Sequence, residues 1–204
     1  MSIETKSHNS TRNPVALDPG IRTFISYYSP LKCGEIGKSD MGKIIRLGHH
    51  LDDLCSKMTK VKAKKRQRMK KAATRIRKRI QNLVSELHWK TATFLCKNFS
   101  TILIPEFKMK SMISKLIAKT SRSLMTWSHF TFRQRLIHLA TKYDTRVIIC
   151  REDFTSKTCT RCGNINNNLG SKKVFICPSC NLRIDRDING ARNILLRALG
   201  DTPV

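Results

Sequence analysis

Two Cys-x-x-Cys pairs near the C-terminal end constrain the fold of this 204-residue chain more than any other feature. The first pair is Cys159 and Cys162, and the second is Cys177 and Cys180. Four thiolates at this spacing can close a tetrahedral shell around one Zn²⁺ ion, and such a site is structural because it leaves no open position for water. The alternative is two disulfides or four idle buried cysteines, which the absence of secretory features disfavours. We therefore predict a zinc ribbon that binds one structural zinc ion.

A helix is predicted directly after the second Cys pair, from Asp185 to about Leu199, with Gly200 at its end. Asp185 suits the N-cap position, and the apolar residues that follow recur on one side of the helix. Asp187 then lies in the first turn, where a helix N-terminus tolerates negative charge, and Gly190 allows close packing on a sheet. The spacing alone favours two structural acids, one capping the helix and one complementing its dipole, over a functional Asp187.

The charge of the chain is strongly positive, with 40 Lys and Arg against 14 Asp and Glu and a formal net charge of +26. Such an excess indicates a polyanionic partner, and nucleic acid is favoured over an anionic membrane surface. No apolar run approaches the length of about 18 residues that a membrane-spanning helix needs, and the polar N-terminus has no signal peptide. Eight cysteines without such a signal indicate a reducing, intracellular compartment.

The remaining elements alternate between strands and helices. Residues 14–29 read as strand, turn and strand around Asp18, residues 101–104 and 146–150 as short strands, and residues 123–143 as a helix. This order predicts an α/β sheet with helices packed on it, and carboxylates at strand ends would gather at one rim of that sheet. An Asp before Pro-Gly is also a common first residue of a turn, so for Asp18 taken alone a turn role is as well supported as a functional role.

No Gly or Pro occurs from His49 to Ile104, and apolar residues recur at helical spacing over much of this span. One helix over this span would be roughly 80 Å long, too long for a compact domain, so we predict two antiparallel helices joined in the basic stretch 62–68. No acidic residue occurs between Ser56 and Ser85, which disfavours an ordinary solvated face of alternating charge. The segment is therefore predicted to bind nucleic-acid phosphates. The candidate residues are Lys62, Lys64, Lys65, Arg66, Arg68, Lys70, Lys71 and Arg75.

Three segments of the chain together resemble the nuclease half of the TnpB family of transposon-encoded, RNA-guided DNA endonucleases. They are 17–24 (LDPGIRTF), 155–163 (TSKTCTRCG) and 185–195 (DRDINGARNIL), and the resemblance runs in the family's order from Val15 to Leu199. The Arg-Thr-Phe of the first segment is most similar to the Fanzor branch of the family. The resemblance implies an α/β, RNase H-like (RuvC-like) mixed sheet with helices, a two-helix basic insertion and a four-cysteine zinc ribbon insert.

The resemblance also implies a domain organisation. We expect a disordered tail over 1–13, a nuclease domain split over 14–153 and 184–200, a zinc-ribbon insert over 154–183 and a short tail over 201–204. Family members usually carry a further N-terminal half that grips guide RNA and target duplex. Only about 14 residues precede the first predicted strand here, so the chain is expected to lack that recognition half.

The resemblance implies three catalytic carboxylates that hold two Mg²⁺ or Mn²⁺ ions. Asp18 takes the first acidic position and Asp187 the third. Glu152 is predicted to supply the second, as in Fanzor-type members that carry this acid after the same strand. Glu106 is the alternate, since it stands one position late after its strand and neighbouring strand positions point to opposite faces. Carboxylate oxygens are the ligands that such hard cations prefer, and a pair of them supports phosphodiester cleavage.

The implied function is that of a transposase-associated, divalent-metal-dependent DNA endonuclease, with DNA and a guide RNA as partners and no membrane association. Its expected place is the nucleus of a eukaryotic or virus-infected cell, or the bacterial cytoplasm and nucleoid; the oligomeric state is left open. One alternative is a non-catalytic, nucleic-acid-binding zinc-ribbon protein, a truncated or degenerate relative whose acids are only turn and cap residues. Another is an RNase H-type enzyme that cuts RNA.

Overall fold

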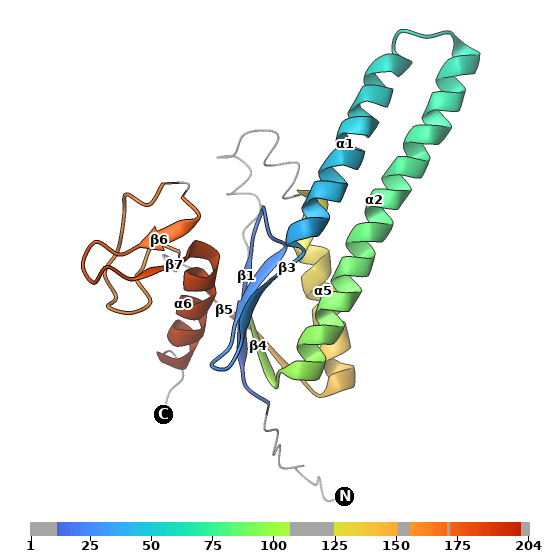
Figure 1. Ribbon diagram of the computed structural model, residues 1–204. Coiled ribbons are helices and arrows are strands. Elements are labelled where there is room, and N and C mark those ends of the chain that lie inside the picture. The colour runs from blue at the N-terminus through green and yellow to red at the C-terminus, as the bar shows by residue number, and fades with distance from the viewer. Residues whose placement is uncertain (1–11, 107–124, 151–155, 171, 201–204) are drawn as a thin grey trace, which may run out of the picture.

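The computed structural model describes residues 12–106, 125–150, 156–170 and 172–200. A five-stranded mixed sheet in the order β3-β2-β1-β4-β5 forms its centre (Figure 1). The strands are β1 (Val15–Pro19), β2 (Ile25–Tyr28), β3 (Cys33–Ile36), β4 (Thr101–Pro105) and β5 (Arg146–Cys150). β2 pairs antiparallel with both β1 and β3, whereas β4 runs parallel to β1 and β5 parallel to β4. The C-terminal ends of β1, β4 and β5 therefore lie at one edge of the sheet.

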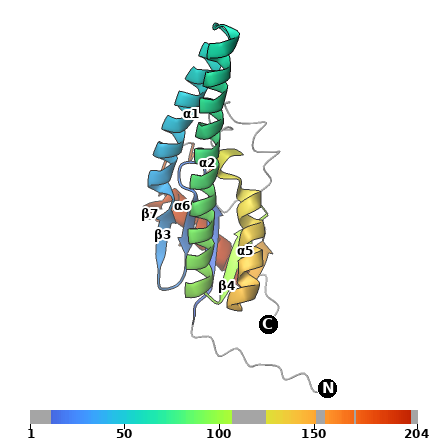
Figure 2. The same cartoon turned by 90° about the vertical axis from the view of Figure 1, so that its right-hand side faces the viewer.

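Helices cover both faces of this sheet (Figures 1 and 2). They are α1 (Lys38–Met58), α2 (Ala63–Asn98), α5 (His129–Tyr143) and α6 (Arg186–Gly200). Helices α1, α2 and α5 lie on one face, over the larger core, and α6 packs on the other. Successive side chains of a strand point to opposite faces of the sheet. Leu17 therefore enters the larger core, whereas Ala16 and Leu103 pack against Ile194 and Leu195 of α6.

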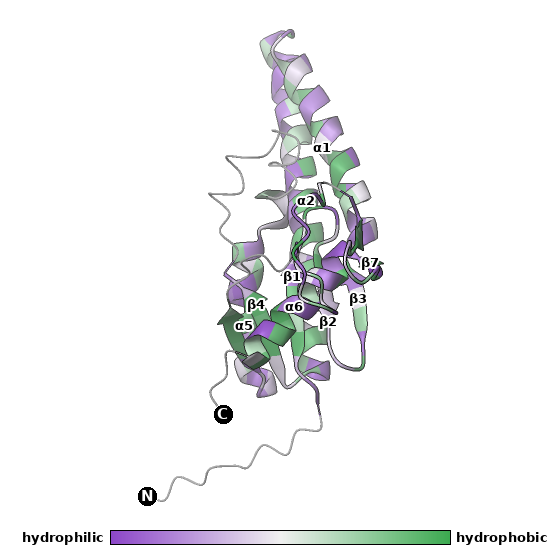
Figure 3. Ribbon diagram, turned by 90° about the vertical axis from the view of Figure 1, so that its left-hand side faces the viewer, coloured by the Kyte–Doolittle hydropathy of each residue, from purple (hydrophilic) through white to green (hydrophobic). Residues whose placement is uncertain are grey.

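The predicted pair of basic antiparallel helices is confirmed as a long hairpin of α1 and α2 that extends well beyond the sheet (Figure 1). The turn lies between Met58 and Ala63, slightly earlier than predicted, because the basic residues from Ala63 onward are already helical. Arg66 stabilises this turn by donating from Nε to the Met58 carbonyl at 3.1 Å and from Nη2 to the Val61 carbonyl at 3.2 Å. Hydrophilic residues recur along both helices (Figure 3).

Two local features differ from the sequence-based expectation. Strand β3 was not predicted, because its Gly and Glu interrupt any strand-like pattern, yet it pairs with β2 along its length. The helix predicted over 123–143 is broken at Ser128, whose φ of 48° is left-handed. The break follows the fully buried Trp127, whose indole Nε1 donates to the Ile21 carbonyl at 3.0 Å, and α5 starts only afterwards. Residues 123 and 124 lie outside the described residues.

The described part of the predicted N-terminal tail consists of Arg12 and Asn13. Arg12 Nη1 donates to the Cys96 carbonyl at 2.9 Å, and the Ser100 amide donates to the Asn13 carbonyl at 3.3 Å. These bonds attach the start of the chain to the connection between α2 and β4. None of the helices in the described ranges has the length and apolar character that crossing a membrane requires.

Candidate metal centres

The four predicted cysteines converge in a small ribbon built on β6 (Val174–Ile176) and β7 (Arg183–Asp185). Their Sγ atoms all lie within 4.8 Å of one another, with 3.6 Å from Cys159 to Cys180 and 3.5 Å from Cys162 to Cys177. Sulfurs bound to zinc at about 2.3 Å form a tetrahedron with edges of about 3.8 Å, so these separations fit a zinc shell. None of the four cysteines is in a disulfide.

Each Cys pair sits on a similar backbone turn. Gly163 and Asn181 follow the two pairs with φ values of 75° and 56°, in the left-handed region where a Gly or Asn is favoured. Their amides donate to the carbonyls of Cys159 at 2.9 Å and Cys177 at 3.1 Å. The Cys180 amide points at the Cys177 sulfur at 3.5 Å, and this bond is the main reason that the pKa of Cys177 falls to about 6. The lowered pKa favours the thiolate, which is the form that binds metal.

Helix α6 holds the ribbon through the wholly buried side chain of Asn189. Its Oδ1 accepts from the Thr160 amide at 3.1 Å, and its Nδ2 donates to the Thr158 carbonyl at 2.8 Å. This amide therefore pairs with the backbone around Cys159 in the manner of a neighbouring strand. Asn193, one turn later, donates to the same Thr158 carbonyl at 2.7 Å. Sequence reasoning missed both residues; the available signal was two Asn four residues apart on the packed side of the helix.

The same helix meets the end of β1 at Gly190. A Cβ added to Gly190 would lie 2.5 Å from Oδ2 of Asp18, so the Asp18 carboxylate occupies the space that any other residue's side chain would fill. Asp187 stands three residues earlier, in the adjacent turn of α6. The turn is fixed by Asp185, whose Oδ1 accepts from the amides of Asp187 at 2.9 Å and Ile188 at 3.3 Å, as predicted for an N-cap. The structure thus brings the Asp18 carboxylate to Gly190 of α6, three residues after Asp187.

The Asp187 carboxylate lies in an electrostatically unfavourable place. Its pKa is raised, first by burial and then by the nearby Asp185 and Glu35 carboxylates. Such a group gains from a neighbouring cation, and the oxygen donors of Asp18 and Asp187 are those that Mg²⁺ and Mn²⁺ prefer. The residues present therefore fit a hard divalent cation.

Glu35 on β3 is a further acid near this site that sequence reasoning missed, because β3 itself was not predicted. Its carboxylate binds Lys38 at 2.6 Å and accepts from Thr23 Oγ1 at 3.2 Å. Lys173, just before β6, lies 3.5 Å from Glu35 and 3.7 Å from Asp185. These contacts link the ribbon, the sheet edge and the start of α6.

The two candidates for the second carboxylate are placed differently. Glu106 is exposed just past β4, its amide donates to the Cys150 carbonyl at 3.1 Å, and it borders a small hollow beside His129 of α5. In β4, Leu103 faces α6, whereas Ile104 faces the larger core. Glu152 lies outside the described residues.

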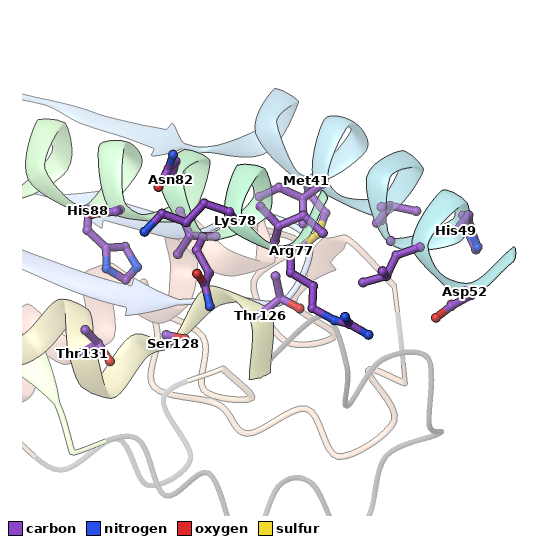
Figure 4. A pocket seen from close by; sticks show the side chains of 18 of the residues that line it. Met41, His49, Asp52, Arg77, Lys78, Asn82, His88, Thr126, Ser128 and Thr131 are labelled. Atoms are coloured by element: carbon purple, nitrogen blue, oxygen red, sulfur yellow. The ribbon is translucent and has the colours of Figure 1, made fainter. Parts of the chain in front are cut away.

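All eight predicted phosphate-binding residues are exposed on the distal part of the hairpin. Arg66 is engaged in the turn, as described above. A groove of about 1030 Å³ lies nearer the sheet, between the hairpin and the start of α5 (Figure 4). Arg77, Lys78 and Arg135 line it together with apolar side chains, but of the described acids neither Asp18 nor Glu106 nor Asp187 does. This groove and the described carboxylates of the candidate site are therefore separate.

Comparison with known proteins gives the family of this chain. A family profile described as Cas12f1-like, TNB domain, matches residues 129–194. A TnpB-like protein of Acanthamoeba polyphaga mimivirus is 31% identical over 202 residues, covering 93% of this chain and 38% of that protein. The chain belongs to the TnpB family.

Other relatives of this TnpB-family chain include proteins with related names. A protein of Paramecium bursaria Chlorella virus 1 that is named as a transposase is 34% identical, over 96% of this chain and 46% of its own length. The Cas12f1 endodeoxyribonuclease of Sulfoacidibacillus thermotolerans is 35% identical over 78 residues, covering 37% of this chain and 18% of that protein. The chain spans less than half the length of each of these relatives.

Solved Cas12f structures share the fold. A CRISPR-Cas12f ternary complex matches with a TM-score of 0.66 and 19% identity, over 89% of this chain and 38% of that chain. A Cas12f1–sgRNA–target DNA complex matches with a TM-score of 0.62 and 21% identity, over 89% of this chain and 49% of that chain. These likenesses and the five-stranded mixed sheet confirm the predicted RNase H-like (RuvC-like) α/β class.

Proposed function

We propose that this chain is a TnpB-type nuclease module that cleaves DNA with two divalent cations held by Asp18, Glu152 and Asp187. The observation that carries the proposal is the contact of Asp18 with Gly190, since it joins the end of β1 to the helix that carries Asp187, three residues from Asp187 along the chain. Turn and cap roles alone do not require a carboxylate from β1 to lie against a glycine of α6. The comparisons support the family, in which relatives are named as transposases and endonucleases.

The chain's own residues would bind and orient the cations at the C-terminal edge of the sheet. Asp18 is fixed by β1, and Asp187 by the N-cap bonds of Asp185. Bound as a pair, such cations activate water and stabilise the leaving oxygen in an in-line phosphodiester cleavage. The absence of a side chain at Gly190 leaves room for the Asp18 carboxylate at this position.

Glu152 remains our proposal for the second carboxylate. It follows Cys150 by two residues, and both Ile148 and Cys150 of β5 pack toward α6, the side on which Asp18 meets Gly190. Glu106 has the opposite parity, since Leu103 packs toward α6 and Ile104 away from it. The described hydrogen bonds of Glu106 involve its backbone and tie it to β5 and α5.

The ribbon is proposed to bind one zinc ion at Cys159, Cys162, Cys177 and Cys180, with a structural role. Its four sulfurs leave no position for a reacting water. The bonds of Asn189 to Thr158 and Thr160 mean that an ordered ribbon supports the helix that carries Asp187. We accordingly divide the chain into a nuclease domain, over 14–153 and 184–200, and a ribbon insert, over 154–183.

Nucleic acid is the proposed partner of the exposed basic hairpin. Its eight predicted residues form no ion pair with a carboxylate within the described ranges, so their charges are available for phosphates. A guide RNA is a further proposed partner, supported by the solved Cas12f1 relative, which is a complex with sgRNA and target DNA.

The test of this function is Mg²⁺-dependent nicking of single-stranded DNA by the purified protein, compared with Asp18→Ala. We expect nicking by the wild type and none by the variant, while both retain zinc. Nucleic-acid binding without nicking in Mg²⁺ or Mn²⁺, with and without co-purified RNA, would instead support a non-catalytic binding protein. Cleavage of RNA but not DNA would support an RNA-cutting enzyme.

The same assay separates the two candidate glutamates. Glu152→Gln is expected to abolish nicking, whereas Glu106→Gln is expected to leave it largely intact. Loss in Glu106→Gln alone would transfer the second metal-binding role to Glu106. Far-UV circular dichroism of both variants establishes that they are folded.

A further inference from the structure

Phe130, in the first turn of α5, is a large aromatic residue whose side chain lies mostly in solvent. It is 60% exposed, whereas Phe132 on the same helix is 1% exposed and belongs to the core. The core of this protein is complete without the Phe130 ring, which makes the ring available to a ligand.

An arginine lies over this ring. The Arg133 guanidinium carbon is 5.4 Å from the centroid of Phe130, within the range of a cation–π contact. Arg133 Nη1 also donates to the Glu106 carbonyl at 2.9 Å, so the guanidinium is anchored to the end of β4. The ring and the cation form a fixed pair rather than two independent side chains.

The pair stands beside the proposed catalytic edge. Phe130, Arg133 and Glu106 border one small hollow together with Pro19, the residue directly after Asp18. His129, the residue directly before Phe130, bonds through Nε2 to the Gly20 carbonyl at 3.1 Å. The start of α5 is thereby attached to the turn that ends β1, and the Phe130 ring keeps a defined position relative to Asp18.

We propose that Phe130 and Arg133 form a stacking platform for one unpaired base of a DNA single strand that lies across the catalytic edge. This proposal rests on the proposed nuclease function, because that function is the reason to expect a DNA strand at the catalytic edge. Aromatic faces beside a basic groove bind single strands without sequence choice, because every base has a π-face. Bases in a duplex already stack on their neighbours, so the platform would select a strand that has been opened.

Two other arginine–aromatic pairs in the described chain are less suited to this role. Arg135 lies 5.4 Å from the ring of Trp89 on α2, and Arg192 lies 5.6 Å from the ring of Tyr28. Trp89 is 41% exposed, and Tyr28 is only partly exposed. Neither ring borders the hollow that Pro19 and Glu106 share with Phe130.

The test compares two single strands that differ only in their bases. One is a thymidine oligonucleotide and the other an abasic sugar-phosphate strand of equal length, each labelled for fluorescence anisotropy in Ca²⁺ buffer. Both strands present the same phosphates, so the basic hairpin contributes equally to each. We expect the wild-type protein to prefer the thymidine strand by about tenfold, the size of one base–aromatic stack.

Phe130→Leu keeps apolar bulk but removes the π-face, and the preference should fall to near unity while binding of the abasic strand stays unchanged. Phe130→Trp should restore the preference. Phe94→Leu is the matched control, since Phe94 is 37% exposed on α2 but packs on Tyr27 at a centroid distance of 5.8 Å. This control should retain the wild-type preference.

Two outcomes would overturn the platform: a wild-type protein that binds both strands equally, or a Phe130→Leu protein with an undiminished thymidine preference. The readout needs no cleavage, so the two proposals fail separately. Base-dependent binding that requires Phe130 in a protein that never nicks DNA would leave the platform standing and remove the nuclease. Nicking of DNA by a protein with no base preference would support the nuclease function and overturn the platform.

Discussion

The contact between Asp18 and Gly190 makes Gly190→Ala a decisive perturbation of the proposed metal site. The added Cβ would lie 2.5 Å from Asp18 Oδ2 and 3.4 Å from its Cγ. Ordinary contact begins near 3.4 Å, so the carboxylate oxygen must move by about 0.9 Å or the helix must shift by a similar amount. Protein ligands hold a metal to within about 0.2 Å of ideal distances, and the displacement exceeds that tolerance several-fold.

The stability of the Gly190→Ala protein should change little. Replacing a helix-interior glycine by alanine stabilises a helix by roughly 0.5–1 kcal/mol, which offsets part of the strain. The atom that must move is the end of a side chain, not backbone, so the strain is relieved by rotation of the Asp18 carboxylate. We expect the free energy of unfolding to stay within about 1 kcal/mol of wild type, with a cost no larger than that of ordinary overpacking.

Mn²⁺ affinity and Mg²⁺-dependent nicking are the quantities to measure, together with urea unfolding. The Gly190→Ala protein should bind Mn²⁺ at least about tenfold more weakly, equivalent to 1.4 kcal/mol, and should not nick DNA. Gly48→Ala is the matched control, because a Cβ at Gly48 in α1 would meet nothing within 4 Å. That control should be slightly more stable than wild type and unchanged in metal binding. Wild-type Mn²⁺ affinity in Gly190→Ala would refute the assignment of Asp18 and α6 to one metal site.

Four further outcomes are expected. Cys159→Ser should lose the single zinc ion found by metal analysis of the wild type, and full zinc content in the variant would contradict the four-cysteine site. Asn189→Asp should weaken the attachment of the ribbon to α6 by about 2–4 kcal/mol, since it removes one buried donor and buries a charge. The variant should then lose zinc to a chelator faster than the wild type does. Equal rates of zinc loss would show that the two hydrogen bonds of Asn189 matter little. Burial lowers the pKa of both His88 and His129 to about 4, so their contribution to the free energy of unfolding is fully present above pH 6.5. It should fall by roughly 2 kcal/mol per histidine between pH 7 and pH 5, where the unfolded chain binds protons that the folded protein does not. Urea unfolding at the two pH values checks this, and an unchanged midpoint would contradict it. Replacing three hairpin cations by Ala should weaken DNA and RNA binding equally across sequences and flatten its salt dependence, and an unchanged salt slope would show that these charges touch no phosphate. Those three cations are Lys64, Lys65 and Arg68.

The sequence predicts correctly those elements that are determined by residues close together in the chain. The spacing of the four cysteines and the N-cap at Asp185 each depend on a few neighbouring residues, and the geometry of each is as predicted. The helical hairpin is predicted for the same reason, since apolar periodicity and the absence of Gly and Pro act over short distances. Its exposed basic surface follows from composition alone.

The features that sequence reasoning missed depend on distant partners. Strand β3 forms because β2 offers it a partner edge, and its own Gly34 and Glu35 do not favour a strand. The break at Ser128 follows from the bond between Trp127 and Ile21, more than 100 residues apart in the chain. Asn189 serves the ribbon only once α6 has packed beside it, so the spacing of Asn189 and Asn193 signals a shared helix side but does not reveal their partner.

The wide separation of β1 and α6 along the chain has a consequence for the order in which parts of this protein form during synthesis. The α1–α2 hairpin is formed by two helices that follow each other in the chain, and it is translated early. Asp18 of β1 meets Gly190 only after α6 has been translated, roughly 170 residues later. Contacts between residues so far apart form late, because the intervening loop must first be closed. A growing chain would therefore present its proposed phosphate-binding surface on the ribosome well before its proposed cutting centre exists. Any nucleic acid that the hairpin captures at that stage would be held by a protein that is not yet able to cleave it.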